Sequence, residues 1–588
     1  MLAAADPVQR VQIEGDERPP LLPFVLAVGL SCGQDRVLSG AEVEQLTSVL
    51  NDLKSQASEI HAANTQFFAN EPIRLVLHTA LAFEAERQSA LLAKELGFDL
   101  HIFRSLDEDP ASGTSLALDA SGELNLPRSD DAFGPATIIG LAIAAHSDLL
   151  IAICDGEPAI VELAAKSARP VIHLPTESQP GLVRWGAFDP AFVTSPNDPA
   201  ALRTYSAEQI GTVLRLLLAP PEQAGERQFI HKFQRERRRL WHLRVEYPLL
   251  LAFSGIARFK RKHFRTDRSN AATDQEWAQY QEACFRAEAV SANTDLLRTW
   301  YEWTDSLAGH FAQSYRSGHV FNFVLGALAV LLGTGNLVLP KWSVLLESAL
   351  FLVVLAIIAN TIAGNRQQWH RRWLDYRQLA ERLRPMRTLK LLAIAAPDPP
   401  GTAADPVARR WVEWYAARVW RAIGAPVGRI DTDRLPALTA TIVDNEIMPQ
   451  VAYHSSAAKQ VVRLDRRLGI ISFSAFVLAL CSSIVLLTGF AIAPAWVDAH
   501  YDWFTVLAAG LPAIGTAAVG IRVQGDHSGG AARSERSAVV LGQIGERLRS
   551  EHTSLKRAAD LTEQSARAML SDLDEWELLN QQHDLTIG

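Results

Sequence analysis

The sequence contains few of the residues that fix a fold through covalent bonds or metal ligation. Its four cysteines, Cys32, Cys154, Cys284 and Cys481, are scattered over 588 residues. No two of them form a Cys-x-x-Cys pair and none has a histidine at metal-ligand spacing, which argues against a disulfide framework and a zinc site. We therefore predict packing roles for all four thiols in a reducing compartment, with no metal ligands and no cofactor.

Basic residues are outnumbered, with 57 lysines and arginines against 65 aspartates and glutamates and a net charge of −8. This balance argues against nucleic acid as a partner of the whole chain. The first residues, Met-Leu-Ala-Ala-Ala-Asp-Pro, lack the basic stretch and apolar run of a cleavable signal peptide. We expect no cleaved signal, so the first membrane helix would itself direct insertion.

Four long apolar runs stand out, at about 318–338, 343–363, 468–493 and 501–523. The first and third contain no Asp, Glu, Lys or Arg, and the charges of the other two lie near their ends. Because about 20 apolar residues span a bilayer and a central charge costs about 2.5–3.5 kcal/mol on insertion, these runs predict four transmembrane helices. Buried core helices are the alternative.

Basic residues flank both pairs of runs at their outer ends. They are Arg316, Arg366, Arg371, Arg372, Arg463, Arg466, Arg467, Arg522 and Arg533. The loop inside the first pair holds one basic residue, Lys341, and the loop inside the second holds Asp498 instead. Since basic flanks stay in the cytoplasm, each pair predicts a hairpin that crosses the membrane and returns, with both termini and residues 364–467 on the cytoplasmic side.

The two hairpins look like copies of one unit. Glu381-Arg382-Leu383-Arg384 after the second run returns as Glu546-Arg547-Leu548-Arg549 after the fourth, 165 residues later. A polar helix also precedes each hairpin, at 301–316 and at 450–467. We predict a repeat of helix, span, span and helix around a pseudo-symmetry axis.

Two of these helices have a distinctive composition. The fourth run is rich in Gly and Ala and contains Pro512, so we expect it at the centre of helix–helix contacts, with the lining of a narrow pore as the alternative. Trp369, Trp373 and Tyr376 share one stripe of the helix after the second run. They predict an aromatic belt at the membrane interface, or a contact with a second chain.

Residues 21–218 alternate short apolar runs with helical patterns, which predicts a Rossmann-like α/β domain with a parallel sheet. The expected strands are 24–30, 73–78, 100–104, 148–154 and 170–174. The expected helices lie near 40–61, 80–97, 134–146, 158–168 and 206–218. Ser39 and Glu42 have capping-box spacing at the first helix, and Gly97 occupies a helix C-terminal position.

Ligands of such sheets bind at the carboxyl ends of the strands, where backbone amides and helix N-termini favour phosphate. The candidate nucleotide-binding residues are Gly29, Ser31 and Gly33 after strand one, Thr79 after strand two, and Asp155, Gly156 and Glu157 after the strand at 148–154. Glycines permit close backbone approach, and the acidic side chains, including Glu84 and Glu86, can accept ribose hydroxyls. Ordinary strand-ending turns are the alternative.

Several motifs carry a resemblance to known groups. Val28–Asp35 (VGLSCGQD), Glu95–Phe98 (ELGF) and His146–Ala152 running into Asp155–Pro158 resemble the SLOG superfamily of Rossmann-like nucleotide-binding domains. Tyr315–Ser317 and Trp373–Arg377, on either side of the first hairpin, resemble the SLATT-type two-transmembrane effectors that accompany SLOG domains in bacterial conflict systems. The resemblance implies a nucleotide sensor joined to a membrane effector.

The sequence departs from the SLOG pattern at its phosphate loops. Ser31–Gln34 stands where the family commonly has Gly-His-Arg, and Ala159–Glu162 stands where it often has a glycine-rich turn. These departures imply a different nucleotide, weak binding or a domain that now serves association. The catalytic Glu–Arg pattern of the related phosphoribohydrolases is missing, so we predict no catalytic residues and no enzyme activity.

Between the domains, residues 226–265 hold twelve Lys or Arg against three Glu. Such a stretch predicts contact with the anionic inner leaflet of the bilayer, with a solvated linker as the alternative. The predicted units are a disordered tail (1–20), the α/β domain (21–218), a basic linker with helices (219–290), a first two-transmembrane unit (291–395), a helical connector packed under the hairpins (396–449), a second two-transmembrane unit (450–575) and a tail (576–588).

Together these patterns predict a nucleotide-sensing integral membrane effector of a bacterial defence system. A signal nucleotide would bind the α/β domain, and the hairpins of a homo-oligomer would then open or disrupt the inner membrane. The alternatives are a regulated ion channel, a membrane-tethered hydrolase and a membrane scaffold whose SLOG-like domain binds nothing.

Overall fold

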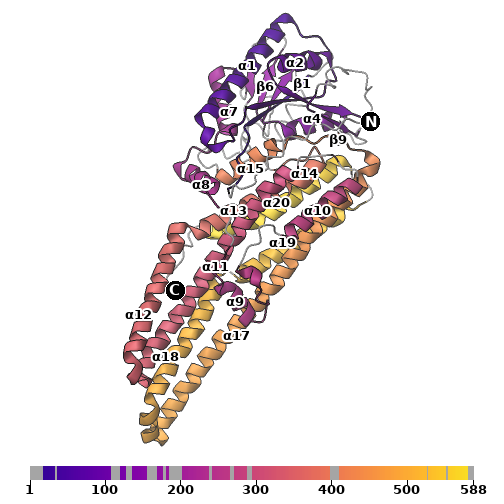
Figure 1. Ribbon diagram of the computed structural model, residues 1–588. Helices are drawn as coiled ribbons and strands as arrows, with labels where there is room; N and C mark the ends of the chain where they lie inside the picture. Colours follow the sequence, from indigo (N-terminus) through magenta and orange to yellow (C-terminus); the bar gives the residue numbers. More distant parts are fainter. Residues whose placement is uncertain are drawn as a thin grey trace.

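The short apolar runs fold into a sheet at one end of the molecule, and the four long runs form helices that extend to the other end (Figure 1). This computed structural model describes residues 18–32, 36–106, 120–127, 135–154, 169–175, 181–183, 202–237, 241–264, 271–287, 290, 294–397, 410–525, 527–550 and 554–580. The predicted multidomain organisation, an α/β domain plus a helical part with four long apolar helices, is confirmed.

The sheet has nine strands among the described residues, in the order β8-β7-β6-β5-β1-β2-β3-β4-β9. The strands are β1 (Val25–Cys32), β2 (Arg74–Thr79), β3 (Asp99–Ser105), β4 (Gly122–Leu126), β5 (Leu149–Ile153), β6 (Val171–Leu174), β7 (Gly181–Val183), β8 (Leu202–Thr204) and β9 (Gly428–Arg429). In this spatial order, the seven strands from β6 through β5, β1, β2, β3 and β4 to β9 all pair in parallel. The two strands at the other edge, β7 and β8, pair antiparallel. The five predicted strands lie within two residues of their expected bounds.

Helices cover both faces of this sheet (Figure 1). One face carries α1 (Gly40–Ala63), α2 (Glu84–Glu95) and α7 (Ala207–Leu218), and the other carries α4 (Pro135–His146). Ser39 and Glu42 form the predicted capping box at α1, and Gly97 follows α2 with a φ of +91°. The helix expected near 158–168 lies outside the described residues.

The predicted connector is part of the α/β domain, which corrects the expected boundaries. Its helix α15 (Trp411–Ala422) lies beside α4 against the sheet, and β9 pairs with β4. Trp411, Trp414 and Trp420 are each no more than 2% exposed. A parallel sheet must be covered on both faces, and α15 supplies cover that residues 21–218 do not. The α/β domain therefore includes a segment nearly 200 residues beyond its predicted end.

The remaining helices form an elongated bundle. They are α8 (Ala224–Gln234), α9 (Glu246–Phe253), α10 (Ala271–Arg286), α11 (Thr294–Val338), α12 (Ser343–Gln367), α13 (Trp369–Leu383), α14 (Met386–Leu391), α16 (Leu435–Ile442), α17 (Met448–Ile492), α18 (Pro494–Gln524), α19 (His527–Leu548) and α20 (Leu555–Asn580). The polar helices expected before each hairpin are continuous with its first span. At 45 residues each, α11 and α17 are about 68 Å long, roughly twice the thickness of the hydrocarbon core of a bilayer.

The boundary predicted at 449/450 falls within one uninterrupted helical stretch, Thr432–Ile492. A π-helical turn, Val443–Ile447, joins α16 to α17. π-Helical turns are rare overall, but those that occur are often found at functional sites. The extra residue interrupts the regular hydrogen-bond pattern of the helix backbone. The second hairpin is therefore connected to the α/β domain through a helical stretch that contains a π-helical turn.

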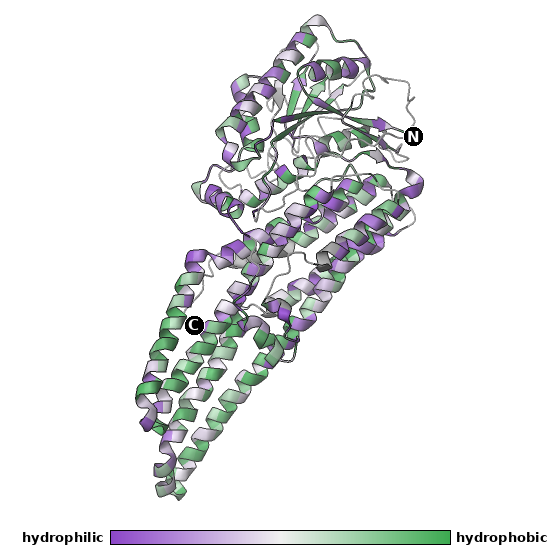
Figure 2. Ribbon diagram, viewed as in Figure 1, coloured by the Kyte–Doolittle hydropathy of each residue, from purple (hydrophilic) through white to green (hydrophobic). Residues whose placement is uncertain are grey.

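Four helices are long and apolar enough to cross a membrane, as predicted. No more than 22% of the most apolar stretch of any of them is buried within the chain. Most of their residues are hydrophobic (Figure 2), and many large apolar side chains among them are exposed. Water would not tolerate apolar patches of this extent, so lipid is the expected solvent. The chain is a multi-pass membrane protein, and both hairpin turns lie at the end farthest from the α/β domain (Figure 1).

The fourth span lies between the first and the third, as its small residues predicted. A Cβ added at Gly510 or at Gly520 of α18 would lie 2.4 Å from Leu331 or 2.2 Å from Phe323, both on α11. At Gly515 it would lie 2.9 Å from Phe476 of α17. The glycines of α18 therefore allow two neighbouring helices to pack against its backbone.

Buried amide side chains hold the two helices of the first hairpin together at the end nearer the α/β domain. Asn360 donates to Asn322 Oδ1 at 2.7 Å, Asn322 donates to Thr361 Oγ1 at 3.0 Å, and Arg244 donates to Asn360 Oδ1 at 2.6 Å. Because these polar groups satisfy one another, they hold α11 to α12. They do not form the unpaired polar lining that a solute pathway needs.

The aromatic stripe of α13 differs from the expected interfacial belt. Tyr376 is fully buried, and its hydroxyl donates to Glu236 at 2.9 Å. Trp369 is 8% exposed, and Trp373 lies against the Tyr315 ring at a centroid distance of 5.5 Å. The stripe packs inside the chain because α13 lies against α11, where these rings fill the space between the two helices.

The hairpin arrangement predicts a labelling pattern in membrane vesicles. Cysteines placed at Lys341 and Asp498, in or next to the two hairpin turns, should react with an impermeant maleimide from one side. A cysteine at the exposed Glu59 of α1 should react from the opposite side. The measurement is labelling of inverted and right-side-out vesicles in a background without native cysteines. Labelling of all three positions from the same side would contradict the arrangement.

Candidate functional site

The carboxyl ends of β1 and β2 lie side by side, so the structure brings together part of the predicted nucleotide site. Ser31 is half-buried near the end of β1, and Thr79 ends β2. The Thr79 hydroxyl is buried and has no hydrogen-bond partner in the part of the chain that the structure describes. Gly33, Asp155, Gly156 and Glu157 lie outside the described residues.

Gly29 serves packing in this fold. It is paired in register with His78 of β2 and Leu150 of β5. A Cβ at this position would lie 2.2 Å from Leu150 Cδ2, 2.6 Å from Ile143 Cγ2 and 2.8 Å from Ser147 Oγ. The absence of a side chain thus lets α4 and β5 approach β1, which differs from the ligand-contacting role expected from sequence.

A glutamate of the protein itself binds the backbone amides at this edge. Glu86 is 2% exposed, and its carboxylate accepts hydrogen bonds from Cys32 N at 3.0 Å and from Ala82 N at 2.8 Å. The other predicted acid, Glu84, pairs with Arg87 at 2.9 Å. Burial, together with the nearby Glu86 charge, raises the pKa of the Cys32 thiol far above its usual range. Glu86 therefore closes the turns after β1 and β2.

We predict that Gly29→Ala destabilises the protein by about 1–3 kcal/mol, because the added methyl must displace tightly packed neighbours. Gly40→Ala is the matched control, since a Cβ at Gly40 meets nothing within 4 Å. Thermal unfolding of the full-length protein in detergent measures the difference. Equal midpoints for the two variants would show that Gly29 is not a packing residue.

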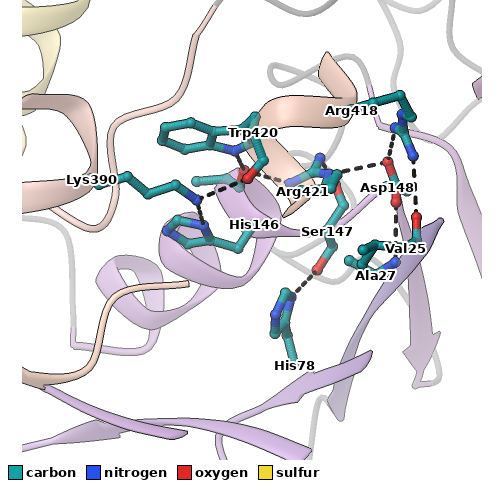
Figure 3. Close-up of polar contacts among 11 residues, drawn as sticks. Val25, Ala27, His78, His146, Ser147, Asp148, Lys390, Arg418, Trp420 and Arg421 are labelled. Carbon is teal, nitrogen blue, oxygen red and sulfur yellow. Dashed lines mark hydrogen bonds and ion pairs between the residues drawn. The ribbon is translucent and has the colours of Figure 1, made fainter. Parts of the chain in front are cut away.

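A cluster of buried polar contacts lies at the opposite end of β1, where α15 meets the sheet (Figure 3). Asp148, 1% exposed, accepts hydrogen bonds from Arg418 Nη2 at 2.6 Å, Arg421 Nε at 3.0 Å and Ala27 N at 3.1 Å. Burial alone would raise the pKa of this carboxyl, but the two guanidinium groups outweigh it and hold the pKa well below its usual range. Asp148 is therefore a permanent anion that ties α15 to the start of β5.

A buried lysine forms a second connection within the same cluster. Lys390 of α14 donates to Gly424 O at 2.5 Å and to His146 Nδ1 at 3.0 Å, and its Nζ lies 3.5 Å from the centre of the Trp420 ring. Burial, and then the charge of Arg421, lower the pKa of Lys390 well below its usual range. His146 donates through Nε2 to Ala393 O at 2.9 Å. Burial, and then the charge of Lys390, lower the pKa of His146, which matches a neutral ring that accepts at one nitrogen and donates at the other.

The cluster also continues into the sheet. The His78 ring forms a hydrogen bond with Ser147 Oγ at 3.1 Å, and Arg421 donates to the carbonyl of Ser147. His78 directly precedes the predicted ligand residue Thr79 in β2. The side chains of the two residues point to opposite faces of the sheet. Ala27 and Cys32, the residues of β1 contacted by Asp148 and Glu86, are five residues or about 16 Å apart.

Ion pairs extend from α15 and α14 to both hairpins. Asp375 of α13 is fully buried, and it accepts from Trp411 Nε1 at 2.8 Å and pairs with Arg410. Arg387 of α14 donates to Glu446 at 2.7 Å, and Glu446 lies in the π-helical turn before α17. The sheet, the end of the first hairpin and the beginning of the second are thus joined through neighbouring helices.

A small cavity of about 40 Å³ lies beside this cluster. Arg169 faces it together with Arg418 and Arg421, and its Nε has no hydrogen-bond partner among the described residues. Burial, and the neighbouring Arg421 charge, lower the pKa of Arg169 to about 9. The volume suits a few water molecules and is far below the roughly 300 Å³ of a small-molecule site. The cluster is therefore suited to coupling the domains and does not accommodate a nucleotide.

Comparison with known protein families, with curated proteins and with solved structures gives no match to this chain. The resemblance to the SLOG and SLATT groups therefore stays a prediction. So do the proposed nucleotide ligand and the absence of enzyme activity.

Sequence reasoning missed the arginines and the lysine of the α15 cluster. Arg418 and Arg421 lie about 270 residues from Asp148 in the chain. One signal was available, since both arginines belong to a helix that also carries three tryptophans. The tryptophans indicate that this helix is largely buried, and a buried arginine needs an anionic partner.

We predict that Asp148→Asn lowers the unfolding midpoint of the full-length protein by about 2–4 °C. The change leaves Arg418 and Arg421 buried without their anion, which costs about 3–5 kcal/mol. Asp433→Asn removes one negative charge from an exposed position and is the control. A midpoint for Asp148→Asn equal to that of the control would mean that the ion pairs do not hold the domains together.

Proposed function

We propose that the chain is a ligand-regulated membrane effector, in which a nucleotide bound by the α/β domain changes the packing of the two hairpins and permeabilises the membrane. It would act at the cytoplasmic side of a bacterial inner membrane. Homo-oligomerisation would supply the pathway, because four mostly apolar spans make a poor pore alone.

The contact between Asp148 and α15 carries this proposal. A sensor that only tethers itself to a membrane needs a flexible linker, whereas here buried charges join the sheet to helices that continue into the spans. Removing either side of such a contact is strongly unfavourable. A displacement of β1 or β5 would therefore be passed on to α15 and α14.

Ser31 and Thr79 are the proposed ligand residues within the described part of the chain. The two strand ends lie next to each other, and the unpartnered Thr79 hydroxyl is available to a ligand oxygen. Parallel α/β sheets bind their ligands at this edge. A ligand there would compete with Glu86 for the backbone amides of Cys32 and Ala82 and so alter β1.

The length of α11 and α17 suits these two helices to transmit such a change. Because α11 and α17 each continue from the bundle into the membrane, a rotation at one end moves the other. The π-helical turn at Val443–Ile447 is the place where α17 can adjust, and Glu446 within it is bound by Arg387. Coupling between distant sites requires an element with two arrangements, and in this proposal the π-helical turn is that element.

A membrane scaffold whose α/β domain binds nothing is the second candidate. Two observations favour it: Gly29 is used for packing, and Glu86 already occupies the amides that would bind phosphate. The two functions differ in whether the full-length protein binds a nucleotide.

The test uses full-length protein in liposomes loaded with a fluorescent dye, exposed to a panel of mono-, di- and cyclic nucleotides. At least one nucleotide should raise dye release several-fold for the wild type. Thr79→Val should abolish both binding and release, while Thr212→Val, at an exposed position of α7, should change neither. Lys390→Met should retain binding, measured by calorimetry, and lose release.

The outcomes separate the candidates. Nucleotide binding without any release would leave a sensor and remove the effector role. No binding of any nucleotide, with unchanged vesicles, would favour the scaffold.

A further inference from the structure

A wide groove opens where the chain leaves the α/β domain and where the second apolar helix ends. One wall consists of α8 and the residues that follow it, and the other consists of the end of α12 and the start of α13. Its volume is about 880 Å³, within the usual range of about 300–1,000 Å³ for small-molecule sites. The groove lies away from both the α15 cluster and the carboxyl edge of the sheet.

The side chains that line this groove are predominantly basic. Lys232, Arg235, Arg237, Arg366 and Arg372 face a single acid, Glu236. Glu236 is 4% exposed and is already engaged, because it pairs with Arg372 and accepts the Tyr376 hydroxyl.

Four basic side chains of the groove have no acidic partner among the residues that the structure describes. Lys232, Arg235, Arg237 and Arg366 form no ion pair with another described residue, although Lys232 donates to Gln368 Oε1 at 2.5 Å. Burial, and then the charges of Arg372 and Arg371, lower the pKa of Lys232, as expected where like charges converge. A groove with four unpaired cations on two walls attracts a multiply charged anion, which would also hold the walls together.

The groove lies at the level where the membrane ends. Arg366 belongs to the last turn of α12, directly after the second apolar run. Trp241 at the groove is 63% exposed, and Leu243 nearby is 88% exposed. Exposed tryptophan beside basic residues is typical of the headgroup region of a bilayer.

We propose that this groove binds a phosphate-bearing anion, either the headgroup of an anionic phospholipid or a free phosphate compound. The anion bridges Arg235 and Arg237 after α8 to Arg366 of α12. Its presence stabilises the contact between the first segment beyond the α/β domain and the first hairpin. This site does not depend on the nucleotide site proposed for the sheet.

The experiment measures the unfolding midpoint of full-length protein in detergent during titration with two probes. One probe is inorganic pyrophosphate, with chloride at matched ionic strength as reference. The other is a short-chain phosphatidylglycerol, with the corresponding phosphatidylcholine as reference. We expect a saturable rise of the midpoint with at least one probe. A response to pyrophosphate identifies a free phosphate site, and a response to phosphatidylglycerol alone identifies a lipid headgroup site.

Variants distinguish a built site from diffuse attraction. The double variant Arg235→Gln/Arg237→Gln should raise the half-saturating concentration by about 30-fold, and Arg366→Gln on the opposite wall by about fivefold. All three arginines are exposed, so the fold should tolerate the changes. The matched control, Arg258→Gln/Arg261→Gln, removes two exposed charges of the same basic segment outside the groove and should shift the value less than about twofold.

Two results would overturn the proposal. In one, the groove variants and the control weaken binding equally, which would mean that the whole basic segment attracts anions without a site. In the other, neither probe raises the midpoint above its reference.

Discussion

The buried carboxylate of Asp148 is the constraint on which the domain arrangement depends. An ionised group without access to water must have partners of opposite charge, and this one obtains them from Arg418 and Arg421 of α15. Those arginines come from the segment between the two hairpins. The second face of the sheet is therefore completed by α15, from the segment between the two hairpins, and this segment connects the α/β domain to both hairpins.

This dependence explains the order of the elements along the chain. The segment between the hairpins returns to the sheet, adds β9 beside β4 and then continues through α16 and the π-helical turn into α17. The first hairpin is connected to the same place through Asp375 of α13. Each hairpin thus contacts α15 or α14 through its own residues. The two 45-residue helices, α11 and α17, continue from this region into the spans.

The two ends of the sheet have different roles. At the amino ends of β1 and β5, buried ion pairs join domains, and the adjacent cavity is too small for a nucleotide. At the carboxyl ends of β1 and β2, Glu86 occupies backbone amides while the Thr79 hydroxyl has no partner among the described residues. Both ends belong to β1, so this strand links the proposed ligand site to the contact with α15.

Local features could be predicted from the sequence alone, because periodicity and length act over short distances. Five of the nine strands, the capping box at Ser39, the four spans and the packing role of the glycines in α18 all followed from residues close together in the chain. Even the ion pairs of α13, such as Arg377 with Glu381 at 2.5 Å, could be predicted from spacing. The adjacency of the carboxyl ends of β1 and β2, where Ser31 and Thr79 lie, followed from the rule that parallel strands end at one edge.

The helix that completes the sheet and the partners of the buried polar groups became known from the folded structure. No spacing rule relates Asp148 to Arg418 and Arg421, which lie about 270 residues away, and Gly29 could be assigned to packing only once Leu150 and Ile143 were in place. Tyr376 likewise fitted an interfacial belt by pattern and proved to be core, because α11 covers it. Burial depends on which distant segments meet, and the alternation of residue types along one segment contains no information about its partner.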